Sequence, residues 1–293
     1  MKKVDLSSLD IQKYLNSIDI DKIGKSLKAL KPRKYKVIID NLEDIIKLDI
    51  DILKIKYLNI CDSFSDDERK DVEKVFSYTS YRKKEKFMEH FKKLNIKSCP
   101  FCNNNYIYFY KKSASKYNAL ATLEHFYPKA QYPHLSLSFY NLVSSCSICN
   151  SKFKGTKKHV GKIHHPYRDD FDNNATFSLS VNTSAVTKDT DLNIHLKSND
   201  AKCKKSIERF QLDKVYEEHR DIAKEIWNKT QVYNDSRIDE LYNSFYKALG
   251  YEREDVKSFI YCNYLDKDDI NKRNHTKLTQ DILKQFELIN KIK

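Results

Sequence analysis

The sequence predicts an α+β protein in which a small β-containing core lies between mostly helical N- and C-terminal regions. The chain has only four Gly and five Pro among 293 residues, so tight turns are few and long helices are favoured over an all-β architecture. Apolar residues recur at helical spacing near both ends, whereas short strand-like patterns are confined to the middle. These observations divide the chain into residues 1–96, 97–167 and 168–293.

The first region, residues 1–96, is expected to be helical. Leu and Ile residues between Asp40 and Tyr57 form a broad apolar face, and Pro32 is expected to separate two earlier helices. Ser65 and Glu68 have the spacing of a capping box, in which the Ser hydroxyl accepts a bond from an unpaired amide at the start of a helix. This region is expected to supply packing and no chemistry.

The second region, residues 97–167, is expected to contain short strands followed by one helix. The expected strands are residues 106–110, 122–126 and 136–143, of which the last two are candidates for pairing. The polar residues 111–118 are expected to form a loop. The helix that opens at Cys146 is expected to end at or near Gly155.

The third region, residues 168–293, is expected to begin with a hairpin and to continue as helices. Residues 176–181 and 192–196 alternate polar and apolar side chains, which is typical of two paired strands. A helix capped by Asp213 is expected to follow, and Gly250 is expected to end the next one.

Hydropathy places the chain among proteins without a membrane segment. No run approaches 18 apolar residues, and the N-terminus lacks the apolar stretch of a signal peptide. We therefore expect a soluble, cytoplasmic protein with no membrane partner.

The net charge of +13 is concentrated in one window of the sequence. Residues 97–162 hold ten Lys, no Arg and one acid, Glu124, which gives +9 and leaves +4 for the other 227 residues. A solvated lysine-rich face is the plainer explanation in a lysine-rich chain, but the near absence of acids in this window argues against it. The window predicts a polyanionic partner such as nucleic acid.

Four of the seven cysteines form two C-x-x-C pairs, Cys99 with Cys102 and Cys146 with Cys149. Each pair places two thiolates on one tight turn, and two such turns complete a tetrahedral site suited to Zn²⁺. Because protein ligands fill all four positions, the site is expected to be structural. A redox pair or chance spacing are the alternatives. The isolated cysteines, expected to be buried small apolar residues, are Cys61, Cys203 and Cys262.

Glu124 and His125 form an adjacent carboxylate–imidazole pair between the two cysteine pairs. A neutral imidazole can take a proton from water near pH 7, and a carboxylate is a hard oxygen ligand for Mg²⁺ or Mn²⁺. Both are what hydrolysis of a phosphodiester requires. Such a pair on its own is more often structural.

Two asparagines complete the constellation. Asn150 follows Cys149 directly, so its amide oxygen could be a second ligand of the catalytic metal, held in place by the zinc knuckle. Asn141 is expected to bond the loop backbone and thereby to fix the approach of His125. Alone, either would be an ordinary turn or cap residue.

This order of residues resembles the HNH endonucleases, whose ββα-metal core is built from a strand with His, a loop with Asn and a helix with Asn or His. The matching residues are Glu124-His125, Pro128, Asn141-Leu142, Cys146-x-x-Cys149-Asn150 and Gly155. The resemblance implies His125 as general base and Asn141 as a positioning residue. It also implies Glu124 and Asn150 as ligands of a catalytic Mg²⁺ or Mn²⁺. The chain departs from the commoner pattern by having Glu instead of Asp before the His, and Asn instead of His at the third signature position.

Further residues near the motif are candidates for substrate contacts. The expected phosphate contacts are Lys152, Lys154, Lys157 and Lys158, which extend from the helix that carries Asn150. His159, His164 and His165 lie just beyond, and His165 is the strongest of them for a functional role, whereas His134 is expected to pack or to be exposed. The tyrosines at 106, 108, 110, 127 and 140 could stack on bases, although core packing is their default role.

A wider set of segments also resembles a known group of proteins. C-P-F-C-N, E-H-F-Y-P-K, S-F-Y-N-L-V and H-P-Y are similar to segments of bacterial HNH proteins of anti-phage systems, including Septu-type and retron-linked nucleases that work beside an ATPase partner. The resemblance implies a defence effector that cleaves DNA, and helical flanks that dock on the ATPase. The alternatives are an RNA- or tRNA-cleaving HNH nuclease, and a zinc-stabilised nucleic-acid-binding module without catalysis. The flanks could also be parts of one larger domain or a homodimer contact.

Overall fold

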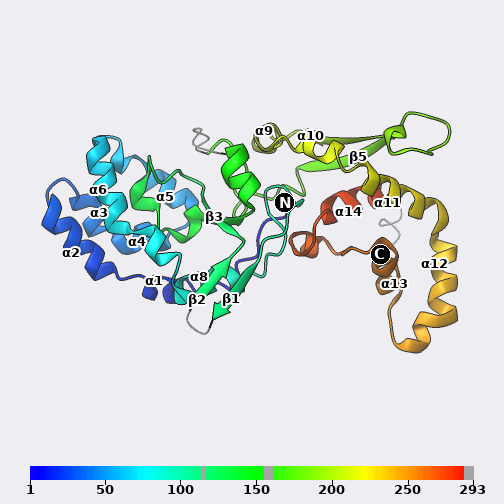
Figure 1. Cartoon of the computed structure of the whole chain (residues 1–293), viewed down its shortest axis with the longest axis horizontal. Coiled ribbons are helices and arrows are strands. Elements are labelled where there is room, and N and C mark those ends of the chain that lie inside the picture. Colours follow the sequence, from blue (N-terminus) through cyan, green and yellow to red (C-terminus); the bar gives the residue numbers. More distant parts are fainter. Residues whose placement is uncertain (114–115, 155–160, 287–293) are drawn as a thin grey trace. The chain divides into compact units, whose positions relative to one another are not determined.

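The structure, a computed structural model, describes residues 1–113, 116–154 and 161–286 (Figure 1). Within them, helices are joined by loops and by separate two-stranded antiparallel sheets. The protein therefore mixes helices with small sheets, and at this level the predicted fold class is confirmed. None of the helices in these ranges combines the length and hydropathy that crossing a membrane requires.

The chain forms two compact units, each built from separate segments. The β3–β4 unit, named after strands β3 (Thr122–His125) and β4 (Leu142–Ser145), consists of Val4–Ile96 and Ile107–Arg168. The β5–β6 unit, named after β5 (Ala175–Val181) and β6 (Leu192–Ser198), consists of Met1–Lys3, Lys97–Tyr106 and the chain from Asp169. Two of the borders between the units lie close to the boundaries that the sequence suggested at 96 and 167. Most of residues 97–167, which were expected to form a separate core, belong to the same unit as the N-terminal helices.

Short helices form most of the β3–β4 unit. They are α1 (Ile11–Asn16), α2 (Ile20–Leu30), α3 (Lys36–Asp40), α4 (Leu42–Lys47), α5 (Ile50–Lys56), α6 (Asp66–Phe76), α7 (Tyr78–Tyr81) and α8 (Glu85–Lys93). The capping box predicted at the start of α6 is confirmed, because Ser65 Oγ accepts from the Glu68 amide and Glu68 Oε2 accepts from the Ser65 amide. Asp49 caps α5 and so divides the apolar stretch expected between residues 40 and 57 into two helices.

An aromatic cluster forms the core of this unit beside the site. Tyr14 and Phe87 lie 5.3 Å apart between ring centroids, and Phe91 stacks on Phe139 at 5.1 Å. Burying such rings is a large apolar contribution to stability. The Tyr14 hydroxyl also donates to the carbonyl of Leu137 at 2.8 Å, so the helices fix the loop that leads into β4.

The strands of the β3–β4 unit differ in part from the sequence prediction. β1 (Phe109–Ser113) pairs with β2 (Lys116–Ala119), so the expectation of a loop over residues 111–118 is wrong. Polar residues can form such a hairpin because strand pairing rests on the backbone and needs no apolar face. The pairing of β3 with β4 is confirmed, but residues 136–141 are not in the strand, because they form 3₁₀ turns and loop before Leu142.

The β5–β6 unit begins with the predicted hairpin, which is confirmed. Its helices are α9 (Ala201–Phe210), α10 (Leu212–Glu217), α11 (Arg220–Val232), α12 (Asp235–Leu241), α13 (Arg253–Tyr261) and α14 (Thr276–Gln285). Gly250 ends the turn after α12 with φ of 80°, as predicted, because only Gly takes this conformation at little cost.

Two expectations for this unit are wrong. The N-cap of α10 is Gln211 in the left-handed region, and Asp213 lies inside the first turn instead of capping it. Cys262 is exposed, because it ends α13 with a positive φ of 51° at a surface turn, whereas Cys61 and Cys203 are buried as predicted.

Candidate functional site

The first cysteine pair lies on a turn that the surrounding backbone holds closely. The Cys99 amide donates to the Asn105 carbonyl at 2.9 Å, and the Asn103 amide donates to the Cys99 carbonyl at 2.7 Å. Asn103 takes a positive φ of 50° and its Nδ2 donates to the Ile270 carbonyl at 2.8 Å. The Asn104 amide points at Cys102 Sγ at 3.5 Å, a contact that favours a thiolate.

The second pair lies between β4 and the helix η4 (Ile148–Lys154), which is a π-helix. The Cys149 amide donates to Cys146 Sγ at 3.4 Å, and the Asn150 amide donates to the Cys146 carbonyl at 3.1 Å. The knuckle therefore forms the first turn of the helix that carries Asn150.

The four sulfur atoms come together. Cys99, Cys102, Cys146 and Cys149 are buried, their Sγ atoms all lie within 4.8 Å of one another, and none forms a disulfide. In a tetrahedral site with Zn–S bonds of about 2.3 Å, neighbouring sulfurs are about 3.8 Å apart, so small side-chain rotations close this cluster around an ion. The cluster can hold a structural metal such as zinc, and this part of the cofactor prediction is confirmed.

Glu124 and His125 occupy the last two positions of β3. In the antiparallel register Glu124 lies opposite Val143 and His125 opposite Leu142. Glu124 is buried and His125 is half-buried. The strand ends at His125, where the Phe126 amide already bonds the Asn141 carbonyl at 2.9 Å.

The ring of His125 is held in one orientation. Its Nε2 lies 3.1 Å from the Ser136 carbonyl, and the ring of Tyr78 meets it edge-on at 4.4 Å between centroids. A carbonyl oxygen can only accept, so Nε2 carries the proton and Nδ1 carries the lone pair of the neutral ring. The geometry thus assigns Nδ1 as the basic nitrogen.

The surroundings of His125 favour the neutral imidazole. Burial lowers the pKa of His125 to about 4, against a partial rise from the hydrogen bond to Ser136. The positive charges of Lys129 and Arg82 lower the pKa further. The ring is therefore uncharged across the neutral pH range and keeps a lone pair on Nδ1.

Asn141 bonds the loop backbone, as expected from the sequence. Its side chain is fully buried, and Oδ1 accepts from the Tyr127 amide at 2.7 Å. Nδ2 donates to the carbonyls of Tyr127 at 3.1 Å and Leu135 at 3.0 Å. Asn141 therefore closes the loop that presents the Ser136 carbonyl to His125.

The side chain of Asn150 is half-buried on η4, and no hydrogen bond to it is recorded within the described ranges. Its amide oxygen thus keeps its lone pairs for another ligand. Lys152 is exposed on the same helix, and the backbone of Lys154 ends it. Lys157, Lys158 and His159 lie outside the described residues.

His165, beyond the helix, serves the fold. His165 is fully buried, its Nε2 donates to the Tyr140 carbonyl at 2.9 Å and its Nδ1 accepts from the Tyr167 amide at 3.2 Å. Both nitrogens are thus used, and this geometry gives His165 a packing role. The Tyr167 hydroxyl donates to the Leu142 carbonyl at 2.8 Å, so the H-P-Y segment supports the start of β4.

His134 is also a packing residue. Its Nε2 lies 2.9 Å from the Tyr57 carbonyl and its Nδ1 3.0 Å from Cys61 Sγ. Burial lowers the pKa of His134 to about 4 and raises the pKa of Cys61 to about 12, so the pair is neutral and not nucleophilic.

Sequence reasoning missed two groups that hold His125. The Ser136 carbonyl is a backbone atom, so no residue type could have revealed it. Tyr78 lies 47 positions earlier in the sequence and looks like an ordinary helical packing residue. Among the tyrosines considered for stacking, Tyr127 is buried, whereas Tyr106, Tyr108 and Tyr110 are 42%, 46% and 43% exposed.

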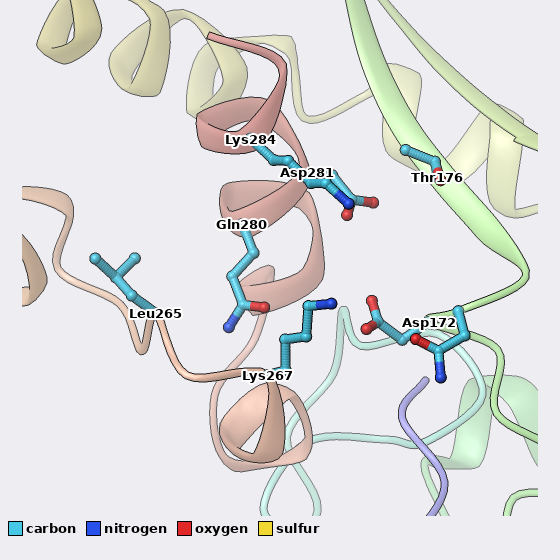
Figure 2. Close-up of a pocket in the computed structure, with 8 residues that line it drawn as sticks. Asp172, Thr176, Leu265, Lys267, Gln280, Asp281 and Lys284 are labelled. Atoms are coloured by element: carbon cyan, nitrogen blue, oxygen red, sulfur yellow. The ribbon is translucent and has the colours of Figure 1, made fainter. Parts of the chain in front are cut away.

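The β5–β6 unit has a small pocket of its own, with a volume of about 130 Å³ (Figure 2). Asp172, Lys267, Gln280, Asp281 and Lys284 line it together with Asn173, Thr176 and Leu265. Two backbone carbonyls hold the side chain of Gln280 in place, because its Nε2 donates to those of Tyr264 and Asp266 at 3.0 and 2.8 Å.

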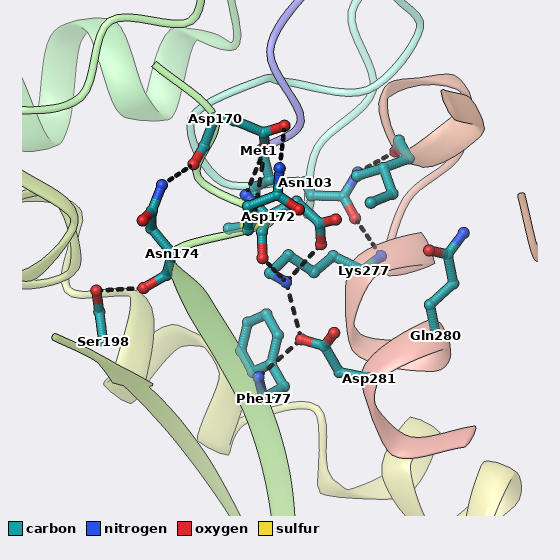
Figure 3. A network of polar contacts seen from close by, with 12 residues as sticks. Met1, Asn103, Asp170, Asp172, Asn174, Phe177, Ser198, Lys277, Gln280 and Asp281 are labelled. Carbon is teal, nitrogen blue, oxygen red and sulfur yellow. Dashed lines mark hydrogen bonds and ion pairs between the residues drawn. The ribbon is translucent and has the colours of Figure 1, made fainter. Parts of the chain in front are cut away.

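The charged floor of this pocket is a structural network (Figure 3). Lys277 is fully buried, and its Nζ lies 2.7 Å from Asp172 Oδ1 and 2.9 Å from Asp281 Oδ2. Asp281 also accepts from the Phe177 amide at 2.8 Å. Burial raises the pKa of Asp281, and Lys277 opposes that rise. Lys277 therefore bridges the two carboxylates and, together with the bond from the Phe177 amide to Asp281, holds α14 against β5.

Comparison of the chain with models of protein families, with curated proteins and with solved structures gave no match in any of the three.

Proposed function

We propose that the chain is a metal-dependent endonuclease of the HNH type that hydrolyses phosphodiester bonds in DNA. The observation that carries the proposal is the setting of His125, a neutral imidazole at the end of β3 that Ser136 holds through Nε2. The order of Glu124-His125 on a strand, Asn141 at a loop end and Asn150 on a helix supports the same assignment through the resemblance described above.

In this proposal His125 is the general base. Its Nδ1 takes the proton from the water that attacks phosphorus, which requires the uncharged ring. Asn141 acts through the loop by fixing the carbonyl of Ser136 and hence the direction of the ring. The ring of Tyr78, 4.4 Å from that of His125 between centroids, also limits its rotation.

Glu124 and Asn150 would hold the catalytic cation. A carboxylate and an amide oxygen are the hard ligands that Mg²⁺ and Mn²⁺ prefer. When bound, such a cation stabilises the negative charge that develops on the phosphate and on the leaving oxygen. The half-buried side chain of Asn150, with no recorded hydrogen bond in the described part of the chain, supports this role.

The four-cysteine cluster would hold zinc for structure alone. Four thiolates complete the tetrahedral shell of Zn²⁺ and leave no position for water or substrate. Cys149 directly precedes Asn150, so an ion in the cluster would also fix the first turn of the helix that presents the proposed ligand.

The basic window of the sequence supports a nucleic-acid substrate. Lys152 is exposed on the same helix as Asn150. The proposed phosphate contacts are this residue together with Lys154, Lys157 and Lys158, and such contacts would position the backbone without reading sequence. The wider resemblance supports a cytoplasmic role in anti-phage defence beside an ATPase partner.

The substrate class is tested by incubating zinc-loaded protein with end-labelled duplex DNA, single-stranded DNA and tRNA. We expect cleavage of DNA that requires added Mg²⁺ or Mn²⁺. Cleavage confined to RNA would replace the proposed substrate by RNA. Binding without cleavage under every metal condition would favour the nucleic-acid-binding module.

A further inference from the structure

Two tyrosines of the β3–β4 unit present their side chains to solvent from one extended segment. Residues 107–110 lead into β1, and Tyr108 and Tyr110 in this segment are 46% and 43% exposed. In contrast, Ile107 is buried and Phe109 is half-buried. Successive side chains of an extended chain alternate between its two faces, so the two tyrosines share the outer face. This face therefore carries two aromatic rings that the core does not enclose.

The backbone that carries these rings is tied to the approach to β3. β1 pairs with β2, and α8 packs beside β2 (Figure 1). The Tyr108 carbonyl accepts from the amides of Leu120 and Ala121 at 2.9 and 3.2 Å. Four residues further along the chain lies His125, and an extended chain of this length spans at most about 14 Å. The segment with the two rings is therefore held close to the proposed general base.

The spacing of the two rings differs from the spacing of bases in a duplex. Residues two positions apart in an extended chain, such as Tyr108 and Tyr110, are about 6.6–6.8 Å apart. Neighbouring bases along one strand of a duplex are only about 3.4 Å apart. Consecutive bases of an intact duplex therefore cannot each lie on one of the rings, whereas the bases of an extended single strand can.

A single strand also offers what an aromatic side chain needs for stacking. In a duplex each base is covered on both faces by its neighbours, so a ring can stack only at an end or where bases have been unstacked. In a single strand the base faces are accessible, and every base has such a face. Sheets with aromatic side chains on one face stack two or three bases of a single strand in this way.

The charge of this part of the sequence suits a polyanion. The sequence of β1 contains Lys111 and Lys112, and that of β2 contains Lys116. Residues 106–123 include no Asp or Glu, and the next acid is Glu124, the proposed metal ligand. The segment therefore supplies no negative charge that would repel a phosphate backbone from the rings.

We propose that Tyr108 and Tyr110 form a stacking platform for the bases of single-stranded DNA. The proposal rests on the nuclease function proposed above and names the form of DNA that the enzyme takes, which is a strand unpaired where it crosses the platform. At about 7 Å for each stacked base, the span of about 14 Å to His125 corresponds to about two further nucleotides. Because stacking tolerates every base, the platform positions the strand without reading its sequence.

An apolar segment of a partner protein fits this face less well. Besides the two phenol rings, the face has Leu120, whose amide bonds the Tyr108 carbonyl and whose side chain is 63% exposed. The exposed area of these three side chains is on the order of 300 Å², well below the roughly 800 Å² that each partner buries in a standard protein interface. Stacked bases need only the faces of the two rings.

Fluorescence polarisation of zinc-loaded full-length protein with fluorescein-labelled oligothymidine tests the platform. No Mg²⁺ or Mn²⁺ is added, so binding is read without cleavage. Tyr108→Ala combined with Tyr110→Ala should weaken binding at least about tenfold, because stacking on one aromatic ring contributes about fivefold or more. Tyr108→Phe combined with Tyr110→Phe should bind as the wild type does, because both ring faces are kept.

Controls separate stacking from changes in fold, apolar contact or charge. Tyr251→Ala, at a tyrosine of the other unit that is 41% exposed, should leave the affinity unchanged. Leu at both platform positions keeps apolar bulk but should weaken binding as Ala does. In the Ala variant, the affinity for a duplex of the same length should change by less than about twofold, and the slope of log affinity against log salt concentration should stay the same, because the rings release no counterions. Circular dichroism checks the fold of each variant.

Several results would overturn the proposal. They are wild-type affinity of the folded Ala variant for oligothymidine, an equal loss of affinity for the duplex, and wild-type binding by the Leu variant. Tighter binding of oligouridine than of oligothymidine would make the occupant RNA. A protein that loses oligothymidine binding in the Ala variant but never cleaves DNA with Mg²⁺ or Mn²⁺ would keep the platform and reject the nuclease function.

Cross-linking decides the question if the Ala variant does not fold. Wild-type protein is irradiated with oligothymidine in which 5-iodouracil replaces some of the bases, and the adducts are located by mass spectrometry. Adducts on Tyr108 or Tyr110 would support the platform. Adducts confined to other residues would exclude it.

Discussion

Replacing Asn141 by Ala should destabilise the β3–β4 unit strongly. The side chain makes three buried hydrogen bonds, at 2.7, 3.1 and 3.0 Å, to the Tyr127 amide, the Tyr127 carbonyl and the Leu135 carbonyl. Asn141→Ala leaves the amide and the carbonyl of Tyr127 without partners in the interior, whereas the Leu135 carbonyl still accepts from the Ser138 amide at 3.1 Å. At about 1–1.5 kcal/mol for each of these two unsatisfied groups, the free energy of unfolding should fall by about 2–3 kcal/mol.

Urea unfolding of zinc-loaded protein, followed by circular dichroism, measures this loss. Asn150→Ala is a matched control, because it removes the same side chain from a site where the described residues record no hydrogen bond to it. The control should change the free energy of unfolding by less than about 0.5 kcal/mol.

Asn141→Asp tests the same reasoning more finely. The carboxylate still accepts from the Tyr127 amide but cannot donate to either carbonyl, and it buries a charge. We expect it to be at least as destabilising as Ala. A loss below about 1 kcal/mol in Asn141→Ala would refute the positioning role given to this residue.

Three further outcomes follow from the same structure. Cys146→Ser should lower the zinc content from about one ion per chain to near zero and unfold the core, whereas the exposed Cys262→Ser should keep its zinc, as elemental analysis can show. Because the pKa of His125 is lowered to about 4, the neutral base persists on acidification, and cleavage should stay nearly constant from about pH 7.5 to about 5.5. A base with the ordinary pKa of about 6.5 would instead lose about tenfold over that interval, and such a loss in the pH–rate profile would contradict the assignment. Lys152→Glu should weaken DNA binding and reduce the slope of log affinity against log salt concentration by about one, the loss of one phosphate contact. The exposed control Lys25→Glu should leave both the affinity and the slope unchanged.

The sequence predicted the elements that depend on interactions between residues close together in the chain. The capping box at Ser65 and the stop at Gly250 are confirmed, because a cap depends on neighbouring backbone groups alone. The hairpin of residues 175–198 is also confirmed, because the alternation of polar and apolar residues along each strand determines which side chains share a face. The four cysteines could be assigned to one metal site, because two pairs of thiolates at this spacing suit few other arrangements.

Elements that depend on distant contacts could not be read from the sequence. The strands β1 and β2 fall in a largely polar stretch of the sequence, so their pattern resembled a loop. The carbonyl of Ser136 and the ring of Tyr78 hold His125, but these contacts cannot be recognised from the types of the residues that make them. The cover of the β5 edge by Asp281 and Gln285 likewise depends on how α14 packs on the hairpin.

The central claim is that His125 is the general base of a metal-dependent nuclease. Its most direct test compares DNA cleavage by wild-type protein, His125→Ala and a His195→Ala control, at equal zinc content and with Mg²⁺ or Mn²⁺ added. We predict that His125→Ala lowers the cleavage rate by about 10²–10⁴-fold while DNA binding and the fold are kept, and that His195→Ala cuts at the wild-type rate. Cleavage by His125→Ala at the wild-type rate would contradict the claim.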